Sequence, residues 1–296
     1  MEMVVSADGT AIAYERTGHG PPLVLLHGTG RDRAYWARSL PALARHATVY
    51  AVDRRGRGGS GDTDRYALER EVEDVLAVLG AIGAPAHLLG HSYGGIVALD
   101  AAARAERLRS LILYEPPFSV GLDGVPPDLG DRLEALLAAG DREAVLVAFL
   151  REGPRFPPAE IAAQRARPDW PDRLAYAHTL PRETQTVRGY AFDAGRAAGL
   201  RWPTLLLLGS ESPPFFRQAI EALHAALPRS EVTVLQGQHH NAMQTAPELF
   251  AEAVHRFLRD HLDGEGREGH RAEESTEVCG LDPTLFAREQ GLLSDE

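Results

Sequence analysis

The sequence predicts a doubly wound α/β fold built on a mostly parallel sheet. One observation is a series of short, continuously apolar runs, which is how strands buried on both faces of a parallel sheet look in sequence. A second is that these runs alternate with amphipathic stretches of helical period, as in α/β proteins. The strands are expected at residues 22–26, 48–52, 86–89, 109–114, 203–209 and 231–235.

The remaining core elements follow from turn residues and from apolar spacing. Asp8-Gly9 lies between two strand-like segments, 2–6 and 10–16, and predicts a β-hairpin. In residues 67–80, apolar side chains recur at i, i+4, i+7, i+8 and i+11 from Leu68, which places them on one face of a helix. Further helices are expected at 32–45, 215–227 and 247–261.

The pattern changes in the middle of the chain and again near its end. From about Phe118 to Leu200 there is no strand signal, and helical patches are separated by Pro or Gly. We therefore expect a core formed by residues 1–116 and 201–262, with a helical lid inserted at 117–200. Residues 263–296 hold ten acidic residues and three arginines and begin with several glycines, which predicts a disordered acidic tail.

Composition narrows the functional classes. The net charge of −11 argues against nucleic-acid binding, which requires a basic face. No apolar run approaches the roughly 18 residues of a membrane span, and the N-terminus lacks the features of a secretory signal. The single cysteine, Cys279, gives neither an internal disulfide nor a Cys-rich metal site. A cytoplasmic protein with no membrane partner is expected.

The segment Gly90-His91-Ser92-Tyr93-Gly94 carries the strongest functional signal. It lies between a predicted strand and a run of good helix formers, which is the context that a Gly-x-Ser-x-Gly nucleophile turn requires. The turn strains the serine backbone, and the flanking glycines avoid side-chain clashes there. Ser92 is therefore the candidate nucleophile.

Other motifs occur in a consistent order around this turn. His27 to Gly30 follows one buried strand, and Asp53 to Gly58 follows the next; His240 lies in the loop after the last strand. Together with the serine turn and the helical insertion, they make residues 2–262 resemble the α/β-hydrolase fold family, in its lid-bearing serine hydrolase branch. The Gly-rich loop at 56–61 lacks the Gly-Lys-Ser/Thr of a phosphate-binding loop.

The resemblance implies a role for each motif. Ser92 would attack the substrate and His240 would act as the base, with His239 as the alternative. The backbone N–H groups of Thr29 and Tyr93 would stabilise the oxyanion. No cofactor and no metal ion are implied.

The acid that orients the histidine is less well defined. The loop after strand 203–209 carries no aspartate, and Glu211 is the carboxylate at the position where the family has its acid. Glu115, which follows strand 109–114, is the alternative, because some members of the fold carry the acid there. Glu211 is preferred on sequence.

These expectations define a serine hydrolase that cleaves an ester-like acyl bond through an acyl-enzyme, as a carboxylesterase or lactonase does. Aromatic residues of the insertion, together with Trp36, predict a pocket for a small and partly apolar acyl substrate. A thioesterase, a carbon–carbon bond hydrolase and a cofactor-free haloperoxidase-like enzyme stay open. So does a non-catalytic module that binds a small ligand with a decayed triad. The sequence does not give the oligomeric state.

Overall fold

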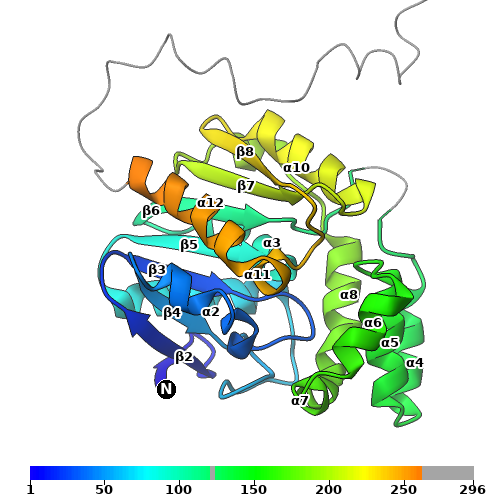
Figure 1. The fold of residues 1–296 in the computed structure, drawn as a ribbon. Helices are drawn as coiled ribbons and strands as arrows, with labels where there is room; N and C mark the ends of the chain where they lie inside the picture. Colours follow the sequence, from blue (N-terminus) through cyan, green and yellow to red (C-terminus); the bar gives the residue numbers. More distant parts are fainter. Residues whose placement is uncertain (121–123, 262–296) are drawn as a thin grey trace, which may run out of the picture. The chain divides into compact units, whose positions relative to one another are not determined.

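A single central sheet lies at the centre of the described fold, and helices pack on both of its faces. The computed structural model describes residues 1–120 and 124–261 of the 296-residue chain, and in this part eight strands form one sheet in the order β1-β2-β4-β3-β5-β6-β7-β8 (Figure 1). The strands β3 to β8 are parallel, whereas β2 pairs antiparallel with both β1 and β4. Their bounds are β1 Glu2–Val5, β2 Ala11–Gly18, β3 Pro22–Leu26, β4 Thr48–Val52, β5 Ala86–His91, β6 Leu108–Tyr114, β7 Thr204–Gly209 and β8 Ser230–Leu235. The predicted doubly wound, mostly parallel sheet is confirmed.

The strand register brings the functional loops together. In β5, Gly90 pairs with Leu26 of β3, and His91 pairs with Tyr114 of β6. Tyr114 in turn pairs with Leu207 of β7. Because these strands are parallel, the residues that follow them emerge at one edge of the sheet, where α/β proteins place their ligands.

Helices cover both faces of the sheet. One face packs against α2 (Leu68–Ile82), α3 (Tyr93–Ala102) and α10 (Pro214–Ala226) in one apolar cluster. The other face packs against α1 (Leu40–Leu43), α11 (Ala242–Thr245) and α12 (Pro247–Asp260), and Figure 1 shows α12 lying across it. This double coverage explains why central strands such as β3 and β7 are apolar along almost their whole length.

The helix expected at 32–45 is two separate short helices. A 3₁₀ helix, η1 (Arg33–Trp36), is capped by Asp32, whose carboxylate accepts the N–H of Ala34 at 3.0 Å. The short α1 then begins with Pro41 in its first turn. Proline has no N–H to donate to the preceding turn, so one continuous helix cannot run through this position.

The segment between β6 and β7 is helical, as expected. Its helices are α4 Leu129–Ala138, α5 Arg142–Glu152, α6 Pro158–Arg165, α7 Trp170–Ala175, η2 Ala177–Thr179, α8 Leu180–Gly189 and α9 Ala194–Ala198. Figure 1 shows α4 to α8 together in green beside the sheet. Prolines stand in the first turns of α6, α7 and α8, where a missing N–H has no cost. An apolar cluster that includes Leu133, Leu146 and Leu180 holds these helices to one another.

Two expectations concern other parts of the chain. The tail expected at 263–296 lies outside the described residues. In the described ranges, no helix combines the length and the apolar character needed to cross a membrane.

Candidate active site

The turn between β5 and α3 has the strained geometry that its sequence predicts. Ser92 has φ 54° and ψ −125°, and its N–H donates to the carbonyl oxygen of Tyr114 at 2.9 Å. A Cβ on Gly90 would lie 2.2 Å from the carbonyl oxygen of Gly94, and one on Gly94 would lie 2.5 Å from that of Leu26. Both positions therefore require glycine, and the tight packing holds Ser92 in a conformation that it would not otherwise adopt.

A buried carboxylate–histidine pair lies at the same edge of the sheet. The Nδ1–H of His240 donates to Oε2 of Glu115 at 2.6 Å. The other oxygen of Glu115 accepts the N–H of Gly209, the last residue of β7, also at 2.6 Å. Glu115 is completely buried, and His240 is only 4% exposed. The Glu115 contact fixes the orientation of the ring and leaves Nε2 as the nitrogen available to take a proton.

The expected acid, Glu211, is not the partner of His240. Its side chain is exposed and accepts a hydrogen bond from the hydroxyl of Ser210 at 3.2 Å, while its N–H donates to the carbonyl of Gln238. The register explains the correction. Because β6 and β7 are adjacent, the residue after Tyr114 reaches the end of β7, and Glu115 takes the position next to His240. The histidine that contacts Glu115 is His240 and not His239.

Burial shifts the pKa values of both groups in this pair. It raises the pKa of Glu115, and the Gly209 N–H opposes this shift by bonding to the carboxylate. Burial also lowers the pKa of His240, and the positive charge of Arg31 adds to the effect. The imidazole is therefore neutral at neutral pH, as a general base must be.

A second histidine, His91, forms a hydrogen bond to the loop that carries His240. His91, the neighbour of Ser92, donates from Nε2 to the backbone carbonyl of His240 at 2.7 Å. The two rings lie 4.5 Å apart, and the ring of Phe216 stacks on His240 at 4.3 Å. This role of His91 has no specific signal in the sequence, because the position has no fixed residue type within the Gly-x-Ser-x-Gly pattern.

The turn after β3 passes directly beside the serine. A Cβ on Gly28 would lie 2.9 Å from the Cβ of Ser92. The turn is held by His27, whose Nδ1–H donates to the Gly28 carbonyl at 2.9 Å and whose Nε2 accepts the N–H of Arg54 at 3.2 Å. Burial lowers the pKa of His27, so it is neutral in this arrangement. This turn brings the backbone of Thr29 to the cavity that contains Ser92.

The other expected oxyanion donor, Tyr93, is the first residue of α3. Its hydroxyl forms a hydrogen bond with the hydroxyl of Tyr66, and its ring lies under the guanidinium of Arg54 at 4.5 Å. The side chain is thus engaged within the protein, and only its backbone N–H remains as a candidate for contact with a substrate. This N–H lies at the N-terminus of a helix, where negative charge is stabilised.

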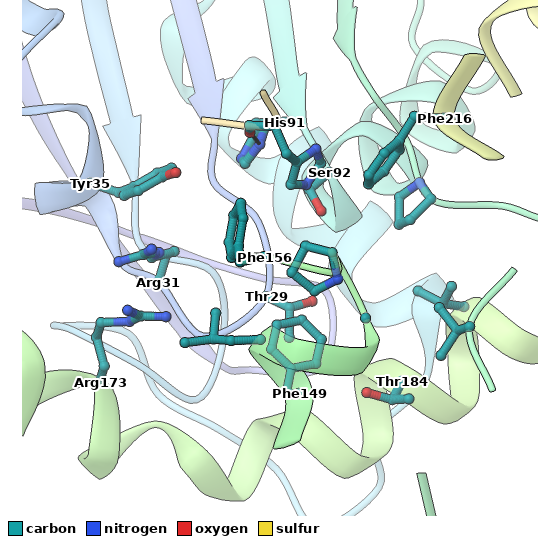
Figure 2. A pocket seen from close by; sticks show the side chains of 17 residues that line it. Thr29, Arg31, Tyr35, His91, Ser92, Phe149, Phe156, Arg173, Thr184 and Phe216 are labelled. Atoms are coloured by element: carbon teal, nitrogen blue, oxygen red, sulfur yellow. Dashed lines mark hydrogen bonds between the residues drawn. The ribbon is translucent and has the colours of Figure 1, made fainter. Parts of the chain in front are cut away.

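Ser92 and His240 line one cavity together with residues of the helical insertion (Figure 2). The helical insertion supplies much of its apolar lining, including Phe149 and Phe156. Trp36, in contrast, is buried in the core. Two arginines, Arg31 and Arg173, also line the cavity. Sequence patterns do not identify Arg31 and Arg173 as site residues, because every one of the 31 Lys and Arg positions is an arginine and nothing distinguishes these two.

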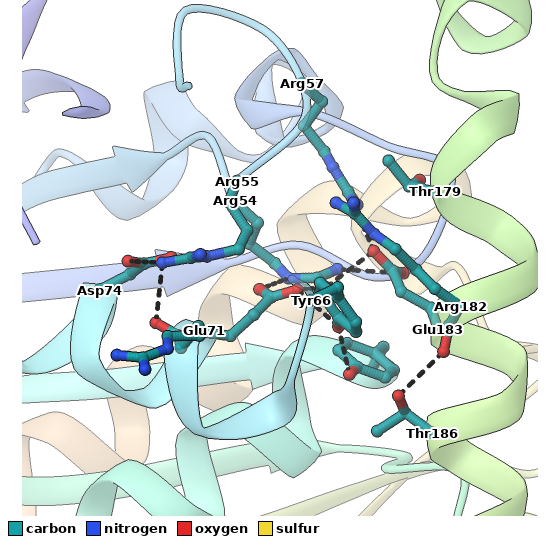
Figure 3. Close-up of polar contacts among 12 residues, drawn as sticks. Arg54, Arg55, Arg57, Tyr66, Glu71, Asp74, Thr179, Arg182, Glu183 and Thr186 are labelled. Carbon is teal, nitrogen blue, oxygen red and sulfur yellow. Dashed lines mark hydrogen bonds and ion pairs between the residues drawn. The ribbon is translucent and has the colours of Figure 1, made fainter. Parts of the chain in front are cut away.

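Buried ion pairs connect the core to the insertion beside this site (Figure 3). Arg54, after β4, bonds to Glu71 of α2 at 2.6 and 2.7 Å and to Glu183 of α8 at 3.0 Å. Arg57 also pairs with Glu183. All four side chains are at most 2% exposed. Within the described ranges, no group of three or more His, Cys, Asp or Glu side chains is arranged to hold a metal ion.

Comparison with known proteins identifies the family. The model of the family described as "Alpha/beta hydrolase family" matches residues 23–253. The pimeloyl-[acyl-carrier protein] methyl ester esterase of Aeromonas hydrophila is 30% identical over 267 residues, covering 84% of this chain and 99% of the relative.

Solved structures agree with that assignment. An alpha/beta hydrolase from Sphaerobacter thermophilus has 39% identity and a TM-score of 0.80, covering 87% of this chain and 100% of the other. The esterase RhEst1 from Rhodococcus sp. ECU1013 has 28% identity and a TM-score of 0.71, with coverages of 88% and 98%. The chain therefore belongs to the alpha/beta hydrolase family and is a hydrolytic enzyme.

Proposed function

We propose that this enzyme is a serine esterase that uses Ser92, His240 and Glu115 to hydrolyse a small carboxylic ester through an acyl-enzyme. The observation that carries the proposal is the buried Glu115–His240 contact of 2.6 Å at the cavity that also contains the strained Ser92. Esterases among the relatives support the same reaction class. Glu115 replaces the Glu211 that the sequence favoured.

In the first half of the reaction, Nε2 of His240 takes the proton of the Ser92 hydroxyl as the oxygen attacks the ester carbonyl. Glu115 keeps the Nδ1–H of His240 in place and stabilises the imidazolium. His240 then gives the proton to the leaving alcohol. Water, activated by the same histidine, releases the acid and restores the serine.

The tetrahedral oxyanion would be bound by the backbone N–H groups of Thr29 and Tyr93. The rigid His27-held turn and the N-terminus of α3 support this role, because donors that are fixed in advance need not reorganise during the reaction. Their side chains take no part.

The insertion at residues 117–200 would act as the lid that selects the substrate. Its side chains form much of the cavity, and their apolar character favours an acyl group with an apolar portion. The chemistry of the first step uses residues of the core alone. Variation in the insertion would therefore change substrate preference and leave the mechanism intact.

The experiment is labelling with a fluorophosphonate probe, alongside hydrolysis of p-nitrophenyl acetate. The wild-type enzyme should react in both assays. Ser92→Ala should lose probe labelling and lose all but a residual of its activity, because the nucleophile is gone, and its circular dichroism spectrum should stay unchanged. Probe labelling that persists in a folded Ser92→Ala variant would remove Ser92 from the mechanism.

A further inference from the structure

Two arginines from distant parts of the chain meet at one side of the Ser92 cavity (Figure 2). Arg31 follows the turn after β3, and Arg173 is on α7 of the insertion. They are only 8% and 3% exposed. A buried guanidinium is costly unless an anion pairs with it, so two of them together require an explanation.

The hydrogen-bond partners of the two arginines are mostly neutral. Both donate to the same atom, Oε1 of Gln164, at 2.8 Å each. Arg173 also donates from Nε to the carbonyl oxygen of Gly30 at 3.2 Å. Its Nη2 atom is buried and has no hydrogen-bond partner among the residues that the structure describes. One donor of a guanidinium that lines this cavity is therefore unsatisfied.

The nearby acids do not balance the two positive charges. Asp169 approaches Nη1 of Arg31 only to 3.8 Å, and it is partly exposed and bonds to Arg167 at 2.9 Å. Glu160 accepts hydrogen bonds from Asn241 and Gln164, and Asp32 accepts one from the hydroxyl of Tyr176. Burial, together with the charge of Arg31, lowers the pKa of Arg173 well below its ordinary value. An additional anion would relieve this excess of positive charge.

The rest of the cavity is chemically different. Most of the other lining residues are apolar, with Phe149, Phe156 and Phe216 among them. A ligand that spans the cavity would therefore be ionic at one end and apolar in the middle.

We propose that Arg31 and Arg173 form a carboxylate-binding subsite, so that the ester cleaved at Ser92 carries a free carboxylate joined to it by an apolar spacer. The inference rests on the proposed esterase function and adds the class of its substrate. A carboxylate suits the geometry because its two oxygens can accept one N–H from each planar guanidinium. Because Asp169 offsets part of the charge of Arg31, a singly charged group fits better than a doubly charged phosphate.

The test compares two esters that differ only in this charge. Monomethyl and dimethyl esters of the same dicarboxylic acid, from succinate to suberate, are assayed with the wild-type enzyme. We expect kcat/KM to favour the monomethyl ester for the best-fitting chain length. In Arg173→Gln and in Arg31→Gln, the ratio of kcat/KM for the two esters should fall at least about tenfold, the value of one charge-assisted hydrogen bond.

Arg165→Gln is the matched control. Arg165 is on α6, is exposed and pairs with Glu143 away from the cavity. Its replacement removes the same charge from the insertion and should leave the ratio unchanged. An equal fall of the ratio in this variant would mean that general electrostatics cause the preference, and the subsite would be rejected.

A purely structural role for Arg173 gives a different result. Because Arg173 holds Gly30, a displaced turn would lower kcat/KM for both esters equally and leave their ratio intact, which would overturn the proposal. A binding measurement is independent of turnover. Calorimetry should detect adipate or a longer dicarboxylate bound to Ser92→Ala but not to the double variant Ser92→Ala, Arg173→Gln. Equal binding to both proteins would contradict the subsite.

The outcomes also separate this inference from the esterase function. If kcat/KM of the wild-type enzyme is the same for dimethyl and monomethyl esters, the subsite proposal is wrong and the serine esterase proposal stands. If neither ester is hydrolysed and the fluorophosphonate probe does not react, the esterase proposal fails. Dicarboxylate binding to Ser92→Ala would then still decide whether the two arginines hold a carboxylate.

Discussion

At the scale of single residues, the contact between Glu115 and His240 decides how the site is interpreted. Glu115 has φ 48°, a conformation that is uncommon for residues other than glycine. The strain is compensated by two short hydrogen bonds, one to His240 and one to the N–H of Gly209. Such strain in a buried carboxylate that holds a cavity-lining histidine is typical of a functional position.

The exchange of Glu115 for glutamine tests whether Glu115 orients His240 and stabilises its imidazolium during the reaction. Glu115→Gln cannot stabilise the imidazolium, so kcat should fall by a factor on the order of 10⁴ while KM changes little. The measurement is steady-state kinetics on one neutral ester at one pH, with folding checked for each variant. Glu211→Gln is the control, because its side chain is exposed and bonds only to Ser210 among the described contacts. A large loss in Glu211→Gln and a near-normal Glu115→Gln would reverse the assignment.

At the scale of elements, the strands and the serine turn could be predicted because local patterns determine them. The strands β5 and β6 begin and end within two residues of the predicted ranges. The acid could not be predicted in this way. Glu115 and Glu211 both follow buried strands, and only the pairing of β6 with β7 shows which carboxylate reaches His240. The choice depends on a long-range contact that no local pattern encodes.

The same limit applies to the join between the core and the insertion. The segment from Asp53 to Gly61 is rich in glycine, which predicts a loop, but its arginines carry no signal of burial. In the structure, Arg54 and Arg57 meet Glu183 of α8 (Figure 3). Insertion and core are thus connected by charges buried in both partners.

Loss of Glu183 should destabilise this connection. Glu183→Gln leaves Arg57 without its carboxylate and Arg54 with Glu71 alone, and removal of one partner from a buried ion pair costs about 3–5 kcal/mol. The free energy of unfolding from urea titration at pH 7 measures the loss. Glu73→Gln, which breaks a pair with the exposed Arg70 on α2, should cost less than about 0.5 kcal/mol.

The pH dependence of the free energy of unfolding shows whether Glu183 stabilises the protein through its charge or through its shape. Burial opposes ionisation of Glu183, but Arg54 and Arg57 outweigh it and hold the pKa below its usual range. Stability from this group is complete above the unfolded pKa of about 4.3 and is lost as the pH falls below it. Wild-type protein should therefore lose more stability than Glu183→Gln between pH 5 and 3. Equal losses of stability in the two proteins would show that the charge of Glu183 does not contribute to stability.

At the scale of the whole molecule, the described fold is complete before the chain ends. The last helix that the structure describes, α12, ends at Asp260 and packs Phe250, Val254 and Phe257 against the sheet. The family match ends at residue 253, and relatives align over almost their full length without using the whole of this chain. Among the described residues, the Glu115–His240 contact and the lining of the cavity come from positions before α12.

Deletion of residues 262–296 should therefore leave folding and ester hydrolysis unchanged. The shortened protein keeps every strand of the sheet and the whole of α12. Differential scanning calorimetry and kcat/KM on one ester, compared with the full chain at equal concentration, measure the effect. For a domain of this size a shift in Tm of about 2–4 °C corresponds to roughly 1 kcal/mol. A larger drop in Tm would mean that the deleted segment packs on the enzyme. A fall in kcat/KM at constant Tm would instead place part of that segment in substrate binding.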